Sequence, residues 1–264
     1  MQKLSFFKFH GAGNDFIMVD NRAGSIVLTP QQIAHICHRR LGVGADGLIM
    51  LDSCDCADFA MHYYNADGSD SMLCGNGSRC ITAMANMLSV IDREGDFLAS
   101  DGIHHAVVDA REDNRWQITI EIKDVDKVTD YADGCFVNTG APHFVRRVNN
   151  IADYPIVKEG RAIRYDERFQ GGTNANFIVP EGEGIRVRTY ERGVEDETLS
   201  CGTGVTASAI IWGHLQQWPD GRYAIPVRTL GGDFIISYDK QEDSYRNILL
   251  SGPVTWAFSG EIDV

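Results

Sequence analysis

Hydrophobic and polar residues alternate with a period of two along much of this chain, which is the pattern of strands in a half-buried sheet. The stretch Trp-Gln-Ile-Thr-Ile-Glu-Ile at residues 116–122 is a clear case. In the first half of the chain, the expected strands cover residues 4–9, 16–20, 48–51, 58–64, 103–109 and 116–122. In the second half, they cover residues 136–138, 143–148, 176–179, 185–190, 233–238, 248–251 and 254–258.

Three segments carry helical patterns instead. Thr29 is a suitable N-cap and Pro30 a suitable first residue for a short helix that Gly42 would end. The other two segments, residues 80–88 and 205–215, are apolar on nearly every face. A helix of that composition is buried on all sides, so we expect one central helix in each half of the chain.

The same short phrase precedes both apolar segments, as Cys-Gly-Asn-Gly at residues 74–77 and Cys-Gly-Thr-Gly at residues 201–204. The two cysteines are 201 − 74 = 127 residues apart in a chain of 264 residues, close to half its length. Such a repeat indicates two similar halves. We therefore predict an α+β fold of two similar domains, each a curved, mainly antiparallel sheet wrapped around a central helix, with the active site in the cleft between them.

A charged stretch at residues 123–133 separates two runs of expected strands and marks the boundary between the domains. We expect residues 1–125 to form the first domain and residues 126–254 the second. The last strand, residues 255–264, is expected to return to the first domain. No long linker or low-complexity segment interrupts this plan.

The composition of the chain indicates which classes of partner to expect and in which cellular compartment the protein acts. The chain has 24 basic and 37 acidic residues, a net charge of −13 and no long basic run, so we expect no nucleic-acid partner. No apolar run approaches the roughly 20 residues that span a bilayer, and we expect neither a membrane partner nor a signal peptide. Seven cysteines at irregular spacings favour reduced thiols over a disulfide framework. We therefore expect a cytoplasmic protein that acts on a small molecule, with a homodimer as a candidate assembly.

The repeated phrase combines an anion site with a reactive thiol. Glycine lets the backbone approach a ligand closely, and the start of a helix presents unpaired N–H groups and the positive end of the dipole. The same setting favours a thiolate over a thiol. Either cysteine alone could be a small buried hydrophobe, but the duplication favours a functional role. Two thiols on opposite faces of one carbon could invert a stereocentre, because one would remove the proton and the other return it.

Three other chemistries fit the residues less well. Cys54-Asp55-Cys56 lacks the paired short spacings of a zinc site, so we expect no metal. Residues 11–16 begin like a dinucleotide fingerprint, but Phe16 stands where the third glycine belongs and a strand follows. No lysine lies in or beside the glycine motifs, which argues against pyridoxal phosphate. We expect no cofactor.

Five segments, spread in order over essentially the whole chain, form a specific pattern. They are His10-Gly11-Ala12-Gly13-Asn14-Asp15-Phe16, Asn65-Ala66-Asp67-Gly68-Ser69, Cys74-Gly75-Asn76-Gly77-Ser78-Arg79-Cys80, Glu191-Arg192-Gly193 and Cys201-Gly202-Thr203-Gly204. This pattern resembles the successive signatures of the diaminopimelate epimerase family. The resemblance implies a cofactor-independent isomerase that interconverts LL- and meso-2,6-diaminopimelate for lysine and peptidoglycan synthesis. In that family a thiolate removes the α-proton and an opposed thiol returns one.

The resemblance also implies roles for individual residues. It makes Cys74 and Cys201 the acid and base pair, with His143 and Glu191 assisting at the reacting centre and Asn14 nearby. The backbone that holds the α-carboxylate would come from Gly75, Asn76, Gly202 and Thr203. The distal, non-reacting end of the substrate would be bound by Asn65, Asn174 and Arg192.

Two departures from the family pattern concern the distal end. Members of the enterobacterial type carry Gly-Asn-Pro-His where this chain has Ala141 in the second position, and they carry Gln where this chain has Gly47. A proline racemase or hydroxyproline epimerase is the nearest alternative, but it binds a monocarboxylate and would not need Arg192 for a second carboxylate. A non-catalytic amino-acid-binding protein is the other alternative, and it would not exchange the substrate's proton with solvent.

Overall fold

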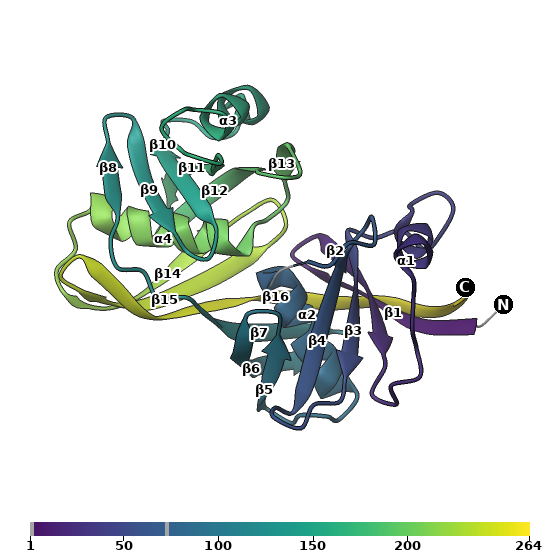
Figure 1. Ribbon diagram of the computed structural model, residues 1–264. Helices are drawn as coiled ribbons and strands as arrows, with labels where there is room; N and C mark the ends of the chain where they lie inside the picture. Colours follow the sequence, from purple (N-terminus) through teal and green to yellow (C-terminus); the bar gives the residue numbers. More distant parts are fainter. Residues whose placement is uncertain (1–2, 72–73) are drawn as a thin grey trace. The chain divides into compact units, whose positions relative to one another are not determined.

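The computed structural model describes residues 3–71 and 74–264 (Figure 1). The chain folds into two compact units. The first comprises the chain up to Ile120 together with Gly252–Val264, and the second comprises Glu121–Ser251. The division after Ile120 lies close to residue 125, where the charged stretch suggests the end of the first domain.

The strands of the first unit follow the order β1-β2-β3-β4-β5-β6-β7-β16, and β16 pairs back with β1, so that the sheet curves around α2. The pairs β2–β3 and β4–β5 are parallel, and each is connected through a helix. The pairs β1–β2, β3–β4, β5–β6, β6–β7 and β1–β16 are antiparallel. The elements are β1 (Lys3–Gly11), β2 (Asn14–Asp20), α1 (Pro30–Cys37), β3 (Gly47–Asp52), β4 (Phe59–Asn65), α2 (Gly75–Met87), β5 (Glu94–Ala99), β6 (Gly102–Glu112), β7 (Arg115–Ile122) and β16 (Ser244–Asp263).

The central helix α2 is buried on all sides, as its composition predicts. Every residue from Asn76 to Ala85 is buried, and the helix contacts β1, β2, β3, β4 and β6. Cys80, Ile81 and Met84 have no exposed surface. Burial of apolar groups on every face fixes the helix in the sheet and therefore fixes the position of its first residue.

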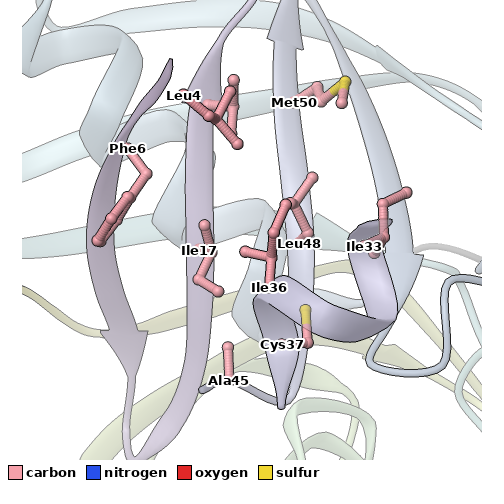
Figure 2. Close-up of a cluster of buried hydrophobic side chains, with 10 residues drawn as sticks. Leu4, Phe6, Ile17, Ile33, Ile36, Cys37, Ala45, Leu48 and Met50 are labelled. Carbon is pink, nitrogen blue, oxygen red and sulfur yellow. The ribbon is translucent and has the colours of Figure 1, made fainter. Parts of the chain in front are cut away.

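The short helix α1 covers the outer face of the same sheet. Thr29 caps it through a reciprocal pair of hydrogen bonds, since its hydroxyl accepts from the Gln32 backbone at 3.3 Å and the Gln32 side chain accepts from the Thr29 N–H at 2.8 Å. Figure 2 shows its apolar side, Ile33, Ile36 and Cys37, facing side chains of β1, β2 and β3. The predicted helix is confirmed, although it ends at Cys37, before Gly42.

The second unit repeats this plan. Its strand order is β16-β15-β14-β12-β11-β10-β9-β8, with β13 beside β12, and its two parallel pairs, β10–β11 and β12–β14, are again connected through helices. The predicted fold class is confirmed. The elements are β8 (Thr129–Tyr131), β9 (Gly134–Asn138), β10 (Pro142–Arg147), α3 (Ile156–Arg164), β11 (Asn174–Glu181), β12 (Gly184–Glu191), β13 (Asp196–Thr198), α4 (Gly202–Leu215), β14 (Gly221–Arg228) and β15 (Asp233–Gln241).

The helix α4 is the counterpart of α2. Ten of its residues are buried, and it contacts β9, β10, β11, β12, β14 and β15. The helix α3 packs on β11 and β12, as α1 packs on its own sheet. Within the described residues, no helix combines the length and the apolar character needed to cross a membrane.

The expectation of separate strands over residues 248–251 and 254–258 is wrong, because both belong to the single strand β16. Pro253 suggests a break, since proline has no N–H to donate to a ladder. In the structure Pro253 lies after Ser251, the last residue of β16 paired with β15, and before Thr255, the first paired with β1. The proline therefore sits where the strand changes partners.

Candidate active site

Cys74 and Cys201 occupy equivalent positions, each as the N-cap of the central helix in its unit. The backbone of Cys74 has φ −119° and ψ 118°, and that of Cys201 has φ −129° and ψ 115°. Cys74 is half-buried and Cys201 is buried. The N–H groups of the first helical turn have no partner inside the helix and carry its positive dipole end. Each thiol is therefore positioned beside the N–H groups at the positive end of a helix.

In the first unit, Asn14 connects the start of β2 to the start of α2. Its side-chain oxygen accepts a hydrogen bond from the Cys74 thiol at 3.7 Å and another from the Asn76 amide at 3.2 Å. Its amide nitrogen donates to Asp46 at 2.7 Å, which fixes the direction in which the side chain points. Asn14, which is expected near the reacting centre, thus forms a hydrogen-bonded cluster with Cys74 and Asn76.

Arg79, a residue for which the sequence predicted no role, adds a buried cation one turn into α2. Its side chain has no exposed surface and donates to the Gly75 carbonyl at 3.1 Å and to the Asn76 side chain at 2.7 Å. Burial lowers the pKa of Arg79 to about 10, and interaction with Cys80 and Cys74 opposes that shift. Arg79 remains charged at neutral pH. Arg79 stands directly before the apolar segment at residues 80–88, so the sequence places it next to a buried helix without showing that the arginine itself is buried.

In the second unit, the neutral side chain of His143 lies beside the start of α4. Its Nε2 lies 2.8 Å from the Thr203 hydroxyl, and its Nδ1 lies 3.0 Å from the Asn176 amide nitrogen. Burial lowers the pKa of His143 to about 3, and the positive charge of Arg192 acts in the same direction. Because the Asn176 amide donates to Nδ1, the imidazole proton resides on Nε2 and points to Thr203.

Thr203 joins the imidazole to the thiol. Its hydroxyl oxygen lies 3.5 Å from the Cys201 sulfur, so that His143 reaches Cys201 through Thr203. On the far side of the imidazole, the Asn176 side-chain oxygen accepts from the Thr189 hydroxyl at 2.9 Å. This chain of uncharged hydrogen bonds orients the Thr203 hydroxyl at the start of α4.

The residues expected at the distal end form two separate sets. In the second unit, the Asn174 side chain accepts from the Arg192 backbone at 2.8 Å, while the exposed Arg192 guanidinium donates to the Gly171 carbonyl at 3.3 Å. Glu191 ends β12 and directly precedes Arg192. In the first unit, Asn65 ends β4, opposite Gly47, and donates to the Ser69 hydroxyl at 3.1 Å.

The tyrosine at position 63 accounts for the glycine at position 47. A Cβ atom on Gly47 would lie 2.6 Å from the Tyr63 ring and 2.6 Å from the Tyr64 carbonyl oxygen, so a larger residue would require both the Tyr63 ring and the Tyr64 backbone to move. The Tyr63 hydroxyl would lie 3.3 Å from that Cβ, and the ring packs edge-on against Phe16. Tyr63 therefore occupies the space of the absent side chain, and Gly47 is the signal that points to it.

Metal-ligating side chains come together away from the cysteine motifs. Over residues 3–71 and 74–264, one group could hold an ion, formed by Asp130, Cys135 and His214. His214 lies in the last turn of α4, at the opposite end of that helix from Cys201. Within this group, the Asp130 carboxylate is 2.9 Å from His214 Nε2 and accepts from the Cys135 thiol at 3.3 Å.

Comparison with known proteins matches both the motifs and the fold. The sequence model of the diaminopimelate epimerase family matches residues 6–100 and 135–257. A diaminopimelate epimerase of Flavobacterium psychrophilum is 40% identical over 98% of this chain and 100% of its own length, and one of Chlorobaculum tepidum is 38% identical over 96% and 98%. A Bacillus anthracis phenazine biosynthesis protein of the PhzF family shares the fold, with a TM-score of 0.81 at 14% identity and complete coverage of both chains. The chain therefore belongs to the diaminopimelate epimerase family.

Proposed function

We propose that the protein is an isomerase that interconverts LL-2,6-diaminopimelate and meso-2,6-diaminopimelate by moving a proton at one α-carbon. The observation that carries this proposal is the pair of cysteines, each placed as the N-cap of a buried helix with nearly the same backbone angles. Membership of the diaminopimelate epimerase family supports the choice of substrate.

In the proposed reaction, Cys74 and Cys201 act on opposite faces of the α-carbon. One thiolate takes the α-proton, and the electron pair of the broken C–H bond delocalises into the α-carboxylate. The other thiol then gives its proton to the opposite face and becomes the thiolate. No atoms are gained or lost, and the reverse reaction exchanges the roles of the two sulfurs.

The two helix starts would stabilise the charge that develops on the carboxylate. We assign this role to the backbone N–H groups at Gly75, Asn76, Gly202 and Thr203. Donors fixed in place before the reaction are worth far more than donors that must reorganise, especially where water is excluded. Positioning the base against the carbon supplies a further roughly 7 to 11 kcal/mol.

His143 is proposed to act by orientation and not by proton transfer. A base whose pKa is lowered to about 3 by burial stays neutral at neutral pH. Its Nε2–H would hold the Thr203 hydroxyl in place beside Cys201. The role of Glu191 is proposed at the same centre, next to Arg192 at the end of β12.

Recognition of the distal end is assigned to Asn65, Asn174 and Arg192, with Tyr63 added. The Arg192 guanidinium is exposed and can pair with a second carboxylate, which a monocarboxylate such as proline lacks. The Tyr63 hydroxyl, placed beside Gly47 in the same row as Asn65, would supply a hydrogen bond from the position where other members carry a side chain at residue 47.

The proposal requires a small-molecule substrate and reduced thiols, and no metal or organic cofactor takes part in the proton transfers. Because the cytoplasm keeps thiols reduced, we place the enzyme there. We also propose a homodimer as its assembly.

The test is an activity assay on protein that has been dialysed against a chelator. We expect LL-diaminopimelate to be converted to the meso isomer, as measured by chiral chromatography, without added metal, pyridoxal phosphate or nicotinamide. Proline and lysine serve as comparison substrates, and both should react poorly. Turnover of proline as fast as diaminopimelate would contradict the assigned substrate, and the absence of any turnover would favour an amino-acid-binding protein.

A further inference from the structure

Two cysteines outside the helix motifs lie side by side in the loop that joins β3 to β4. The sulfur atoms of Cys54 and Cys56 are 3.1 Å apart, and the Cys56 backbone N–H donates to the Cys54 sulfur at 3.4 Å. Cys56 is exposed and Cys54 is half-buried. This loop therefore presents two thiols, already in contact, to solvent.

Three other cysteines provide a contrast. Cys37, Cys80 and Cys135 are buried. Burial raises the pKa of the Cys37 thiol to about 11 and that of Cys135 to about 12, and it also raises the pKa of Cys80. The thiolate is the reactive form of cysteine. These three thiols are therefore protected from reaction, because they are out of reach of solvent and because they stay protonated.

Cys54 has the opposite environment. The contact with the Cys56 thiol, together with backbone hydrogen bonds from Cys56 and Ala57, lowers the pKa of Cys54. The same pairing raises the pKa of Cys56. The lower pKa suits Cys54 to be the attacking cysteine, which must be a thiolate at the first step. The higher pKa suits Cys56 to be the resolving cysteine, which reacts only at the second step.

We propose that Cys54 and Cys56 form a redox-active dithiol that reacts with small-molecule disulfides such as glutathione disulfide. In the first step the Cys54 thiolate attacks one sulfur of the disulfide and expels one glutathione thiolate, which leaves a mixed disulfide on Cys54. In the second step Cys56 loses its proton and attacks the Cys54 sulfur, which expels the second glutathione. The dithiol is thereby oxidised to a Cys54–Cys56 disulfide, and glutathione disulfide is reduced to two thiols.

The loop with Cys54 and Cys56 lies at the opposite end of the β3–β4 pair from Asn65, the residue assigned to the distal end of the substrate. It follows Asp52, the last residue of β3, whereas Gly47 and Asn65 lie at the other end of the β3–β4 pair. Strands of this length extend about 20 Å. The exchange reaction is therefore separate from the proposed epimerisation, and it can be present or absent whether or not that function is correct.

The test combines exchange with glutathione disulfide, alkylation of the remaining thiols and mass mapping of the peptides. In the wild-type protein we expect a Cys54–Cys56 link with little bound glutathione. In Cys56→Ser the first step has no second step to follow it, so a mixed disulfide should accumulate on Cys54. In Cys54→Ser the modification of Cys56 should be at least about tenfold slower. Cys135→Ser, which alters a buried thiol, is the matched control and should behave as the wild type.

Two results would overturn the proposal. The first is glutathione bound separately to Cys54 and Cys56 in the wild type without a link between them. The second is modification of Cys56 in Cys54→Ser as fast as that of Cys54 in Cys56→Ser. Epimerase activity of both variants, measured before oxidation, should equal that of the wild type, and peptide mapping distinguishes this link from any that involves Cys74 or Cys201.

Discussion

The first turns of α2 and α4 begin with nearly the same backbone conformation, but the side chains around them differ in charge. Arg79 and Thr206 both stand five residues after their cysteine, since 79 − 74 = 206 − 201 = 5. Arg79 donates to the Gly75 carbonyl at 3.1 Å, and Thr206 donates to the equivalent carbonyl of Gly202 at 3.0 Å. The same acceptor is therefore satisfied by a cation in the first unit and by a hydroxyl in the second.

The partners of the two thiols differ in the same way. Cys74 donates to an amide oxygen, that of Asn14, close to a charged guanidinium. Cys201 lies beside the Thr203 hydroxyl, which a neutral imidazole holds in place. The helix start is therefore the part common to both halves, while the side chains around it differ and make the two thiols chemically unequal.

The largest expected effect comes from removing either thiol. Cys74→Ala and Cys201→Ala should each lower kcat at least about a thousandfold, because each thiol serves in one protonation state that the other cannot replace. The double variant should be little worse than either single variant. Steady-state assays in both directions provide the measurement. Substantial activity in either alanine variant would show that the two helix starts are not both needed.

The difference in charge between Arg79 and Thr206 predicts that replacing them lowers activity less than removing a thiol, and by unequal amounts. Arg79→Met removes charged hydrogen bonds beside Cys74 and should lower kcat/KM on the order of 10- to 100-fold. Thr206→Val removes a neutral hydrogen bond from the matching position and should cost less than about tenfold. Iodoacetamide, which reacts with thiolates, should alkylate Cys74 more slowly in Arg79→Met. Equal losses in the two variants would mean that the charge at Arg79 has no special role.

The first unit should also contribute a hydroxyl to distal-end binding. Tyr63→Phe is expected to raise KM about fivefold with little change in kcat, because one hydrogen bond of about 1 kcal/mol is lost to both ground and transition states. Tyr64→Phe is the control, since Tyr64 packs against the outer cluster with α1. A normal KM in Tyr63→Phe would remove Tyr63 from the site.

The neutral His143 predicts a pH dependence of stability. The folded protein keeps this imidazole neutral down to about pH 3, whereas the unfolded chain protonates it below the ordinary value of 6.5. The unfolded state therefore binds more protons between these values, and the free energy of unfolding contributed by His143 falls as pH falls, by up to about 1.4 kcal/mol per pH unit. Urea unfolding at pH 7 and pH 5 should show a weaker pH dependence in His143→Asn. An unchanged dependence would contradict the buried neutral state.

The central helices could be predicted from sequence because their residues are apolar on every face, and few other structures bury such a segment. The helix α3 and the strand β14 were not predicted, since each contains a residue that argues against it. Gly160 weakens the helical signal of α3, yet a Cβ there would lie 2.3 Å from the Tyr190 side chain. Pro226 weakens the strand signal of β14 in the same way. Tertiary contacts decide both elements.

Some residues of the candidate site could be identified from sequence motifs, and others only from their packing in the structure. The cysteines and their glycines could be identified because they repeat. Arg79 reads as a surface charge until the burial of its helix is known, and Tyr63 becomes relevant only through its contact with Gly47. Residues that act through a neighbour carry no signal of their own in one sequence.

The most direct test of the central claim, that two different thiols remove and return the proton, is the position of deuterium in the first turnovers. LL-diaminopimelate is incubated with the enzyme in heavy water, the reaction is stopped at low conversion, and the α-positions of substrate and product are analysed by NMR and mass spectrometry. We expect the meso product to carry deuterium at the inverted carbon while the recovered LL substrate retains protium, because the returning proton comes from a second, solvent-exchanged thiol. Product that retains the substrate's own protium would contradict this expectation and would point to a single base.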